Sequence, residues 1–85
     1  MLKWTAPRRW PVVLANVFSK TLIEAAPRIV RAVEKGGRLI LSGILREQTP
    51  EVVAAFNREG FAVERVVRKG KWVTLVMRHA QHRRS

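Results

Sequence analysis

The stretch that decides the fold is "VVLANVFSKTLIEAAP", which runs from Val12 to Pro27. Four apolar residues, Val12 to Ala15, end on Asn16, and a helix-like pattern follows at once. A short apolar run with β-branched residues is typical of a strand that is covered on both faces. The stretch therefore predicts a buried strand that leads into a helix, with one amide side chain at the end of the strand.

The helix after this strand is predicted from the spacing of its apolar residues. Ser19 can cap it, and Pro27 predicts either a kink or a regular part that starts near the proline. Gly36 and Gly37 are expected to end it, because glycine takes the left-handed position after a helix without a Cβ penalty. The apolar positions that recur at helical spacing are Leu22, Ile23, Ala26, Ile29, Val30 and Val33.

The middle of the chain repeats this order. The segment "RLILSGIL", residues 38–45, predicts a second strand that Ser42-Gly43 closes. The run Thr49-Pro50-Glu51 predicts a helix start, with a hydroxyl cap, a proline at the first turn and an acid near the positive helix end. Gly60 is expected to end this helix.

The last part of the chain predicts a hairpin. The segments "FAVERVVR", residues 61–68, and "KWVTLVMR", residues 71–78, both have strand-like composition. Only Lys69-Gly70 separates them, which is short enough for an antiparallel pair. Trp72 is expected to be a core residue of the last strand, because alternation and its size both suit burial.

The order of elements is therefore strand, helix, strand, helix, strand, strand. Strands joined through a helix run parallel with a right-handed crossover, and a closing hairpin adds an antiparallel strand. The sequence predicts an α/β fold whose sheet is mostly parallel with an antiparallel C-terminal strand.

Two polar positions are expected at one crevice of this sheet. Ligands of open α/β sheets bind outside the carboxyl ends of the parallel strands, and Asn16 and Ser42-Gly43 both follow such ends. An asparagine there offers one acceptor oxygen and two donor hydrogens, which suits an amine or the polar part of a cofactor. The alternative is an ordinary turn or helix-capping asparagine.

Length and composition limit the class of protein. Its 85 residues suffice for one small domain with a marginal core. No apolar run approaches the about 18 residues that span a bilayer, and the chain has no cysteine, so we expect a cytoplasmic protein without a membrane contact or disulfide. His79 and His82 are the only imidazole ligands and both fall near the tail, so no metal site is expected.

The charge balance is strongly basic. The chain has 17 Lys plus Arg against 6 acids, a net charge of +11, and every acid is a glutamate. Such an excess favours a polyanionic partner such as ribosomal RNA. The basic residues are spread along the whole chain without an aromatic-interleaved RNA motif, so exposed arginine-rich helix faces are an equal alternative.

Several segments in order resemble one enzyme family. They are "VVLANV", "L(I)EAAP", "KGGRLILSGIL", "GF" and "GKWVTLVMR". Together they are similar to the C-terminal half of the PrmA-type methyltransferases, which use S-adenosylmethionine to methylate amino groups of the eleventh protein of the large ribosomal subunit. The resemblance covers residues 12–78 and implies part of a Rossmann-like methyltransferase sheet.

The resemblance also implies roles for particular residues. Asn16 corresponds to the catalytic asparagine beside the amine, and Asn16 with Val17 to cofactor contacts. Gly36-Gly37 matches a structural turn, and Gly70 with Trp72 matches a "G-x-W" near the end. The residues that would form the substrate side of the crevice are Phe18, Ser42, Gly43 and Ile44.

The departures from the family pattern concern the cofactor. The chain contains neither a Gly-rich turn after a first strand nor an acid placed to hold ribose hydroxyls. Residues 1–10 match poorly and look like an irregular lead-in, residues 11–80 form the methyltransferase part, and residues 81–85 form a basic tail. We therefore expect a fragment that starts before the fourth strand of a seven-stranded sheet and is inactive alone.

Two further expectations follow. An edge strand that lacks its neighbour exposes apolar surface, so the chain is expected to associate with itself. The alternative to an enzyme fragment is a small basic module that binds RNA or the ribosome without catalysis, for which the candidate residues are Arg65, Arg68, Lys69 and Lys71. A remnant with a purely structural role is a third reading.

Overall fold

A computed structural model describes residues 9–80 of the chain. The expectations for most of the lead-in, for the basic tail and for His82 fall outside these residues. No helix within the described part is long and apolar enough to cross a membrane.

The observed elements follow the predicted order. A short 3₁₀ helix at Arg46–Gln48 precedes the second α-helix. The elements are β1 (Trp10–Ala15), α1 (Ser19–Arg31), β2 (Val33–Leu45), α2 (Thr49–Arg58), β3 (Phe61–Lys69) and β4 (Trp72–His79).

The sheet is mixed rather than mostly parallel. Its strand order is β1-β2-β4-β3. Only β1 and β2 pair in parallel, whereas β4 pairs antiparallel with both β2 and β3. The C-terminal strand is thus antiparallel as predicted, but it lies between β2 and β3 instead of being added outside them, so two of the three pairings are antiparallel.

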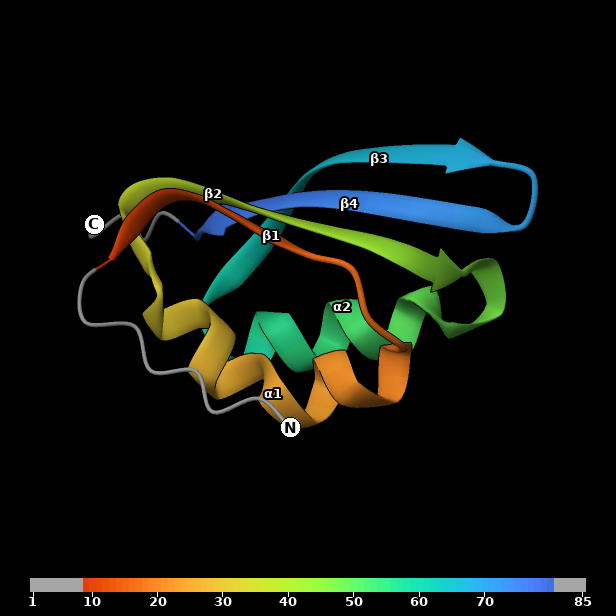
Figure 1. The fold of residues 1–85 in the computed structure, drawn as a ribbon, viewed down its shortest axis with the longest axis horizontal. Coiled ribbons are helices and arrows are strands. Elements are labelled where there is room, and N and C mark those ends of the chain that lie inside the picture. The colour runs from red at the N-terminus through yellow and green to blue at the C-terminus, as the bar shows by residue number, and fades with distance from the viewer. Residues whose placement is uncertain (1–8, 81–85) are drawn as a thin grey trace.

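Both helices lie on one side of the sheet (Figure 1). Strands β1, β2 and β3 share one direction, because β2 and β3 both run antiparallel to β4. The chain moves across the sheet in the same sense twice, and right-handed crossovers then place both helices on the same face.

The hydrophobic core fills the space between this face and the two helices. Phe56 of α2 and Phe61 of β3 are the largest side chains in it. The other buried members of the cluster are Leu22, Ala26, Val33, Leu39, Leu41, Ile44, Val52, Ala55, Val73, Leu75 and Met77.

The opposite face of β1 is open, which corrects the expectation of a strand covered on both faces. Val12 is 55% exposed and Leu14 is 66% exposed, whereas Val13 and Ala15 pack against the core. Strand β1 also forms one edge of the described sheet. The predicted apolar edge is therefore present.

Helix α1 ends earlier than predicted. It stops at Arg31, and Val33 is the first residue of β2, paired with Trp10 of β1. The Trp10 N–H donates to the Ala32 carbonyl over 2.7 Å, so strand pairing replaces the last helical turn. Gly36 and Gly37 therefore lie inside β2. Pro27 lies inside an otherwise continuous helix, so the helix does not start there.

The two predicted hydroxyl caps are absent. Phe18 and Gln48 occupy the N-cap positions of α1 and α2, and neither side chain bonds to the helix. Ser19 and Thr49 are instead the first helical residues. The Thr49 hydroxyl donates to the Leu45 carbonyl over 3.2 Å.

The end of α2 and the C-terminal hairpin are confirmed, whereas β1 starts at Trp10, within the predicted lead-in, and β2 starts at Val33 instead of residue 38. Helix α2 ends at Arg58, and Gly60 follows with a positive φ of 85°. Strands β3 and β4 form the predicted antiparallel hairpin around Gly70.

Candidate functional site

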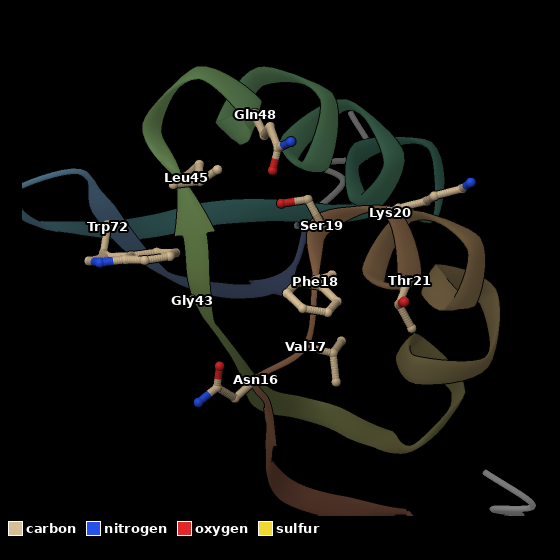
Figure 2. A pocket seen from close by; sticks show the side chains of 10 residues that line it. All are labelled: Asn16, Val17, Phe18, Ser19, Lys20, Thr21, Gly43, Leu45, Gln48 and Trp72. Carbon is tan, nitrogen blue, oxygen red and sulfur yellow. The ribbon is translucent and has the colours of Figure 1, made fainter. Parts of the chain in front are cut away.

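A groove of about 760 Å³ lies at the carboxyl ends of β1 and β2, where α1 begins (Figure 2). Strand β4 starts at the same rim, because it runs antiparallel to β2. The residues that line the groove are Asn16, Val17, Phe18, Ser19, Lys20, Thr21, Gly43, Leu45, Gln48 and Trp72.

Asn16 and Gly43 lie against each other at the centre of this rim. A Cβ atom added to Gly43 would lie 2.5 Å from the Asn16 Oδ1. The parallel pairing of Ala15 with Leu41 brings these two chain segments together. The prediction that Asn16 and the Ser42-Gly43 pair emerge at one rim is confirmed.

A bulge in β2 decides which side chains face the groove. The register with β4 shifts between Leu41 and Ile44, and Gly43 within the bulge has a positive φ of 77°. Glycine adopts this conformation without the Cβ clash of other residues. The close approach to Asn16 therefore depends on Gly43.

The same bulge corrects one predicted site residue. Strict alternation from the buried Leu41 would place Ile44 on the open face, but the extra residue turns it inward. Ile44 is fully buried in the core and therefore does not line the crevice. Ser42 is half-buried and is absent from the groove lining given above for the described residues.

Val17 and Phe18 lie in the groove as the resemblance implied. They form the link between β1 and α1, and both are exposed, Phe18 by 82%. A phenyl ring that is this exposed does not contribute to the hydrophobic core. Figure 2 shows it between Asn16 and the first turn of α1.

Trp72 is exposed in the groove, which corrects the expectation of a core residue. Its indole is 47% exposed, and it pairs with Leu45 of β2. Val73 is the buried neighbour, and alternation places Trp72 on the other face. The Lys71 ammonium lies 5.4 Å from the centre of the indole ring. Strict alternation back from Leu75 was the signal that places this residue outside the core.

The sequence reasoning missed the wall that α1 and the 3₁₀ helix supply. Ser19 and Gln48 belong to this wall, and their side chains approach the same part of the groove (Figure 2). No periodic pattern in the sequence predicts these contacts, because they depend on how the start of α1 packs beside the end of β2.

The lining of the groove carries little charge. Of the described residues that line it, Lys20 carries the single charge, and none is acidic. No three His or Glu side chains of residues 9–80 gather around a point where a metal ion could bind. His79 lies apart from the groove, with its ring 4.3 Å from that of Phe61.

This arrangement can hold an uncharged polar group between apolar walls. The Asn16 amide offers hydrogen-bond donors and an acceptor at the rim, and Phe18 and Trp72 offer aromatic surface. Such a groove can seat the alkyl part of a side chain and orient its terminal amine.

Comparison with known proteins identifies the family of the chain. The family model of ribosomal protein L11 methyltransferase (PrmA) matches residues 2–80, so the match includes the lead-in that the sequence reading had set apart. The L11 methyltransferase of Geobacter sulfurreducens is 45% identical over 73 residues, which cover 86% of this chain and 24% of the relative. The chain thus spans about a quarter of that relative's length.

Solved structures show the same fold. The L11 methylase of Lactobacillus delbrueckii subsp. bulgaricus superposes with a TM-score of 0.82 at 23% identity, over 86% of this chain and 38% of that one. The M1.HpyAVI–SAM complex gives 0.71 at 11% identity, over 86% and 46%. With the family match over nearly all its residues, the chain belongs to the PrmA family of ribosomal protein L11 methyltransferases.

Proposed function

We propose that this chain forms the substrate side of an S-adenosylmethionine-dependent methyltransferase that acts on amino groups of ribosomal protein L11. The observation that carries the proposal is the contact of Asn16 with Gly43 at the carboxyl rim of the parallel β1–β2 pair. The names of the relatives supply the substrate protein.

Asn16 is the proposed catalytic residue. A methyl group passes from a sulfonium to a nitrogen lone pair, so the amine has to be neutral and aligned when it attacks. The Asn16 Oδ1 accepts a hydrogen bond from one amine N–H, which directs the lone pair away from the amide. Phe18 and Trp72 flank the alkyl arm and exclude water from it.

The cofactor supplies the methyl group, and this chain offers only part of its site. Ribose hydroxyls are commonly held by a carboxylate, and no described residue of the groove is acidic. Asn16 and Val17 fit the edge of such a site near the reacting atoms. We therefore assign the ribose and adenine contacts to family sequence that precedes this region, and we expect no methyl transfer by the 85 residues alone.

A chimera tests this function. Residues 9–80 replace the matching region of the Geobacter sulfurreducens relative, and methyl transfer to recombinant L11 is measured with labelled S-adenosylmethionine. We expect activity within about tenfold of the parent, and at least a hundredfold loss in kcat on Asn16→Ala, the scale on which the loss of one positioned polar group acts.

The matched control is Asn57→Ala, an exposed asparagine of α2 outside the groove. It should leave the rate unchanged. An active chimera whose rate survives Asn16→Ala would exclude the catalytic role of this amide, and a folded chimera without activity would contradict the proposed function itself.

A second candidate function is contact with RNA through the β3–β4 hairpin. Four basic side chains toward its turn are exposed, and the hairpin is long relative to the body of the fold (Figure 1). The residues concerned are Arg65, Arg68, Lys69 and Lys71. Clustered cations of this kind bind phosphates in a salt-dependent manner.

This second function has its own test. The affinity for a ribosomal RNA fragment is measured between low and moderate salt for the wild type, Lys69→Glu and Asn16→Ala. RNA contact predicts that Lys69→Glu weakens binding and flattens the salt dependence while Asn16→Ala does neither. Equal affinity of all three would exclude the hairpin as the contact.

A further inference from the structure

The first turn of α1 contains a polar atom without a partner. Ser19 is 6% exposed, and its Oγ has no hydrogen-bond partner within residues 9–80. A buried hydroxyl without a partner is costly, so such atoms are rare in folded proteins. This one lies in the wall of the groove described above.

The positive N-terminal end of α1 also has no negative side chain in its first turn. A helix begins with free N–H groups and a partial positive charge, which acidic side chains commonly offset. The first turn of α1 has no acidic residue, and no side chain caps it in the described structure. Lys20 adds a cation beside it, although Figure 2 shows its ammonium directed away from the groove.

The other helix provides the contrast. Helix α2 carries Glu51 in its first turn, and its first residue, Thr49, has its hydroxyl bonded to the Leu45 carbonyl. No side chain caps either helix, but within the described residues only α1 lacks an acidic residue in its first turn and leaves the hydroxyl of its first residue without a partner. The difference indicates a ligand position at α1.

We propose that the N-terminal turn of α1 binds a carboxylate group through the Ser19 hydroxyl, the backbone N–H groups of the turn and the side-chain amide of Gln48. Figure 2 shows the Gln48 amide beside the Ser19 hydroxyl with its oxygen on that side, so a turn of the amide about its last bond brings the NH₂ group to the carboxylate. All these groups can donate hydrogen bonds, and hydrogen bonds to an anion are the stronger kind. The carboxylate is a ligand that this groove does not supply itself.

Two sources can provide such a carboxylate. One is an acidic residue next to the target amine in a protein substrate, and the other is the methionine end of the cofactor. The assignment of the carboxylate to one of these two sources rests on the proposed function, whereas the carboxylate-binding site itself does not.

The test is a titration of the ¹⁵N-labelled chain with sodium acetate, followed by NMR, with sodium chloride at equal ionic strength as the control. We expect saturable shifts of the Ser19, Lys20 and Thr21 amides with acetate and not with chloride. The amides of Glu51 and Val52 in α2 are the internal control and should not move. Equal shifts at both helices, or none at α1, would overturn the proposal.

The matched variant is Ser19→Ala. Because the hydroxyl has no partner, its removal should leave the thermal midpoint unchanged or raised, and the acetate dissociation constant should rise at least about tenfold. A lowered midpoint would assign the hydroxyl to the fold instead, and unchanged acetate binding would exclude it from the site. Gln48→Ala provides a second variant with the same expected direction.

Two further ligands identify the source. The peptide acetyl-Lys-Glu-amide is compared with acetyl-Lys-Gln-amide, and S-adenosylhomocysteine is added separately. Shifts at α1 with the glutamate peptide alone assign the site to a protein substrate, and shifts with S-adenosylhomocysteine assign it to the cofactor. Acetate binding that neither larger ligand reproduces would overturn the assignment to a biological carboxylate. Loss of activity in the chimera would contradict the methyltransferase function without affecting the acetate result.

Discussion

The two faces of the sheet differ in how they are covered. One face packs against α1 and α2 and contributes Leu39, Leu41, Leu75 and Met77 to a core without exposure to solvent. On the other face, Val12 and Leu14 are mostly exposed. All-parallel sheets are covered on both sides, whereas sheets with antiparallel pairs can face water on one side. The difference teaches that the two helices cover only one face and leave apolar side chains of β1 exposed on the other.

The open face is not uniformly apolar. Glu64 of β3 bonds to Arg38 of β2 through two oxygens, with the Arg38 Nε 2.6 Å from Oε1. The Nε of Arg78 in β4 lies 4.0 Å from the Oε2 of Glu64. These ion pairs link three strands across the side that has no helix.

The largest effect on the free energy of unfolding is expected from truncating a core side chain on the covered face. Phe56→Ala removes the largest buried side chain of α2 and should lower the free energy of unfolding by about 3–5 kcal/mol, which is most of the stability of a small domain. The measurement is urea denaturation followed by circular dichroism. The control on the open face is Leu14→Ala, which should change the free energy by less than about 0.5 kcal/mol. Equal losses would show that both faces are buried in solution.

The second effect concerns the bulge at the rim of the sheet. Gly43→Ala forces a Cβ into a positive φ and against Asn16, and should cost about 1–3 kcal/mol in unfolding free energy. Gly70→Ala has a similar φ with nothing within 4 Å of its Cβ, and should cost about 1 kcal/mol. A loss for Gly43→Ala no greater than for Gly70→Ala would contradict the tight contact with Asn16.

A smaller effect is expected for the ion pair. Glu64→Gln keeps the shape of the side chain but removes its charge, and should lower the unfolding free energy by about 0–1 kcal/mol, because both partners are partly exposed. The difference from the wild type should shrink in 1 M salt, as measured by the same denaturation series. A loss that persists unchanged in high salt would point to packing instead of charge.

The smallest effect on stability, and the clearest on association, is expected at the edge. We propose that the chain associates with itself through β1. Leu14→Lys should leave the unfolding free energy within about 0.5 kcal/mol and shift the sedimentation profile toward monomer. The matched control is Val66→Lys, an exposed valine on β3 at the other end of the sheet, which should not change association. A wild-type chain that sediments as a monomer at all concentrations would refute self-association.

The sequence by itself determined the order of helices and strands, the β3–β4 hairpin and the placement of Asn16 directly after a strand. These features depend on local properties: apolar periodicity, proline and glycine positions, and the length of the turn at Gly70. The neighbourhood of Asn16 and Gly43 also followed, because the carboxyl ends of adjacent parallel strands share one rim.

Only the tertiary structure decided which side chains reach the groove. The bulge before Ile44 turns that residue into the core, while Trp72 and Leu45 pair on the outer side. The pairing of Trp10 with Val33 ended α1 before its glycines, and the insertion of β4 between β2 and β3 set the mixed sheet. The bulge, the early end of α1 and the position of β4 each depend on contacts between segments distant in sequence, whose packing energies outweigh local preference. The outward position of Trp72 is the exception, because the alternation of β4 already indicated it.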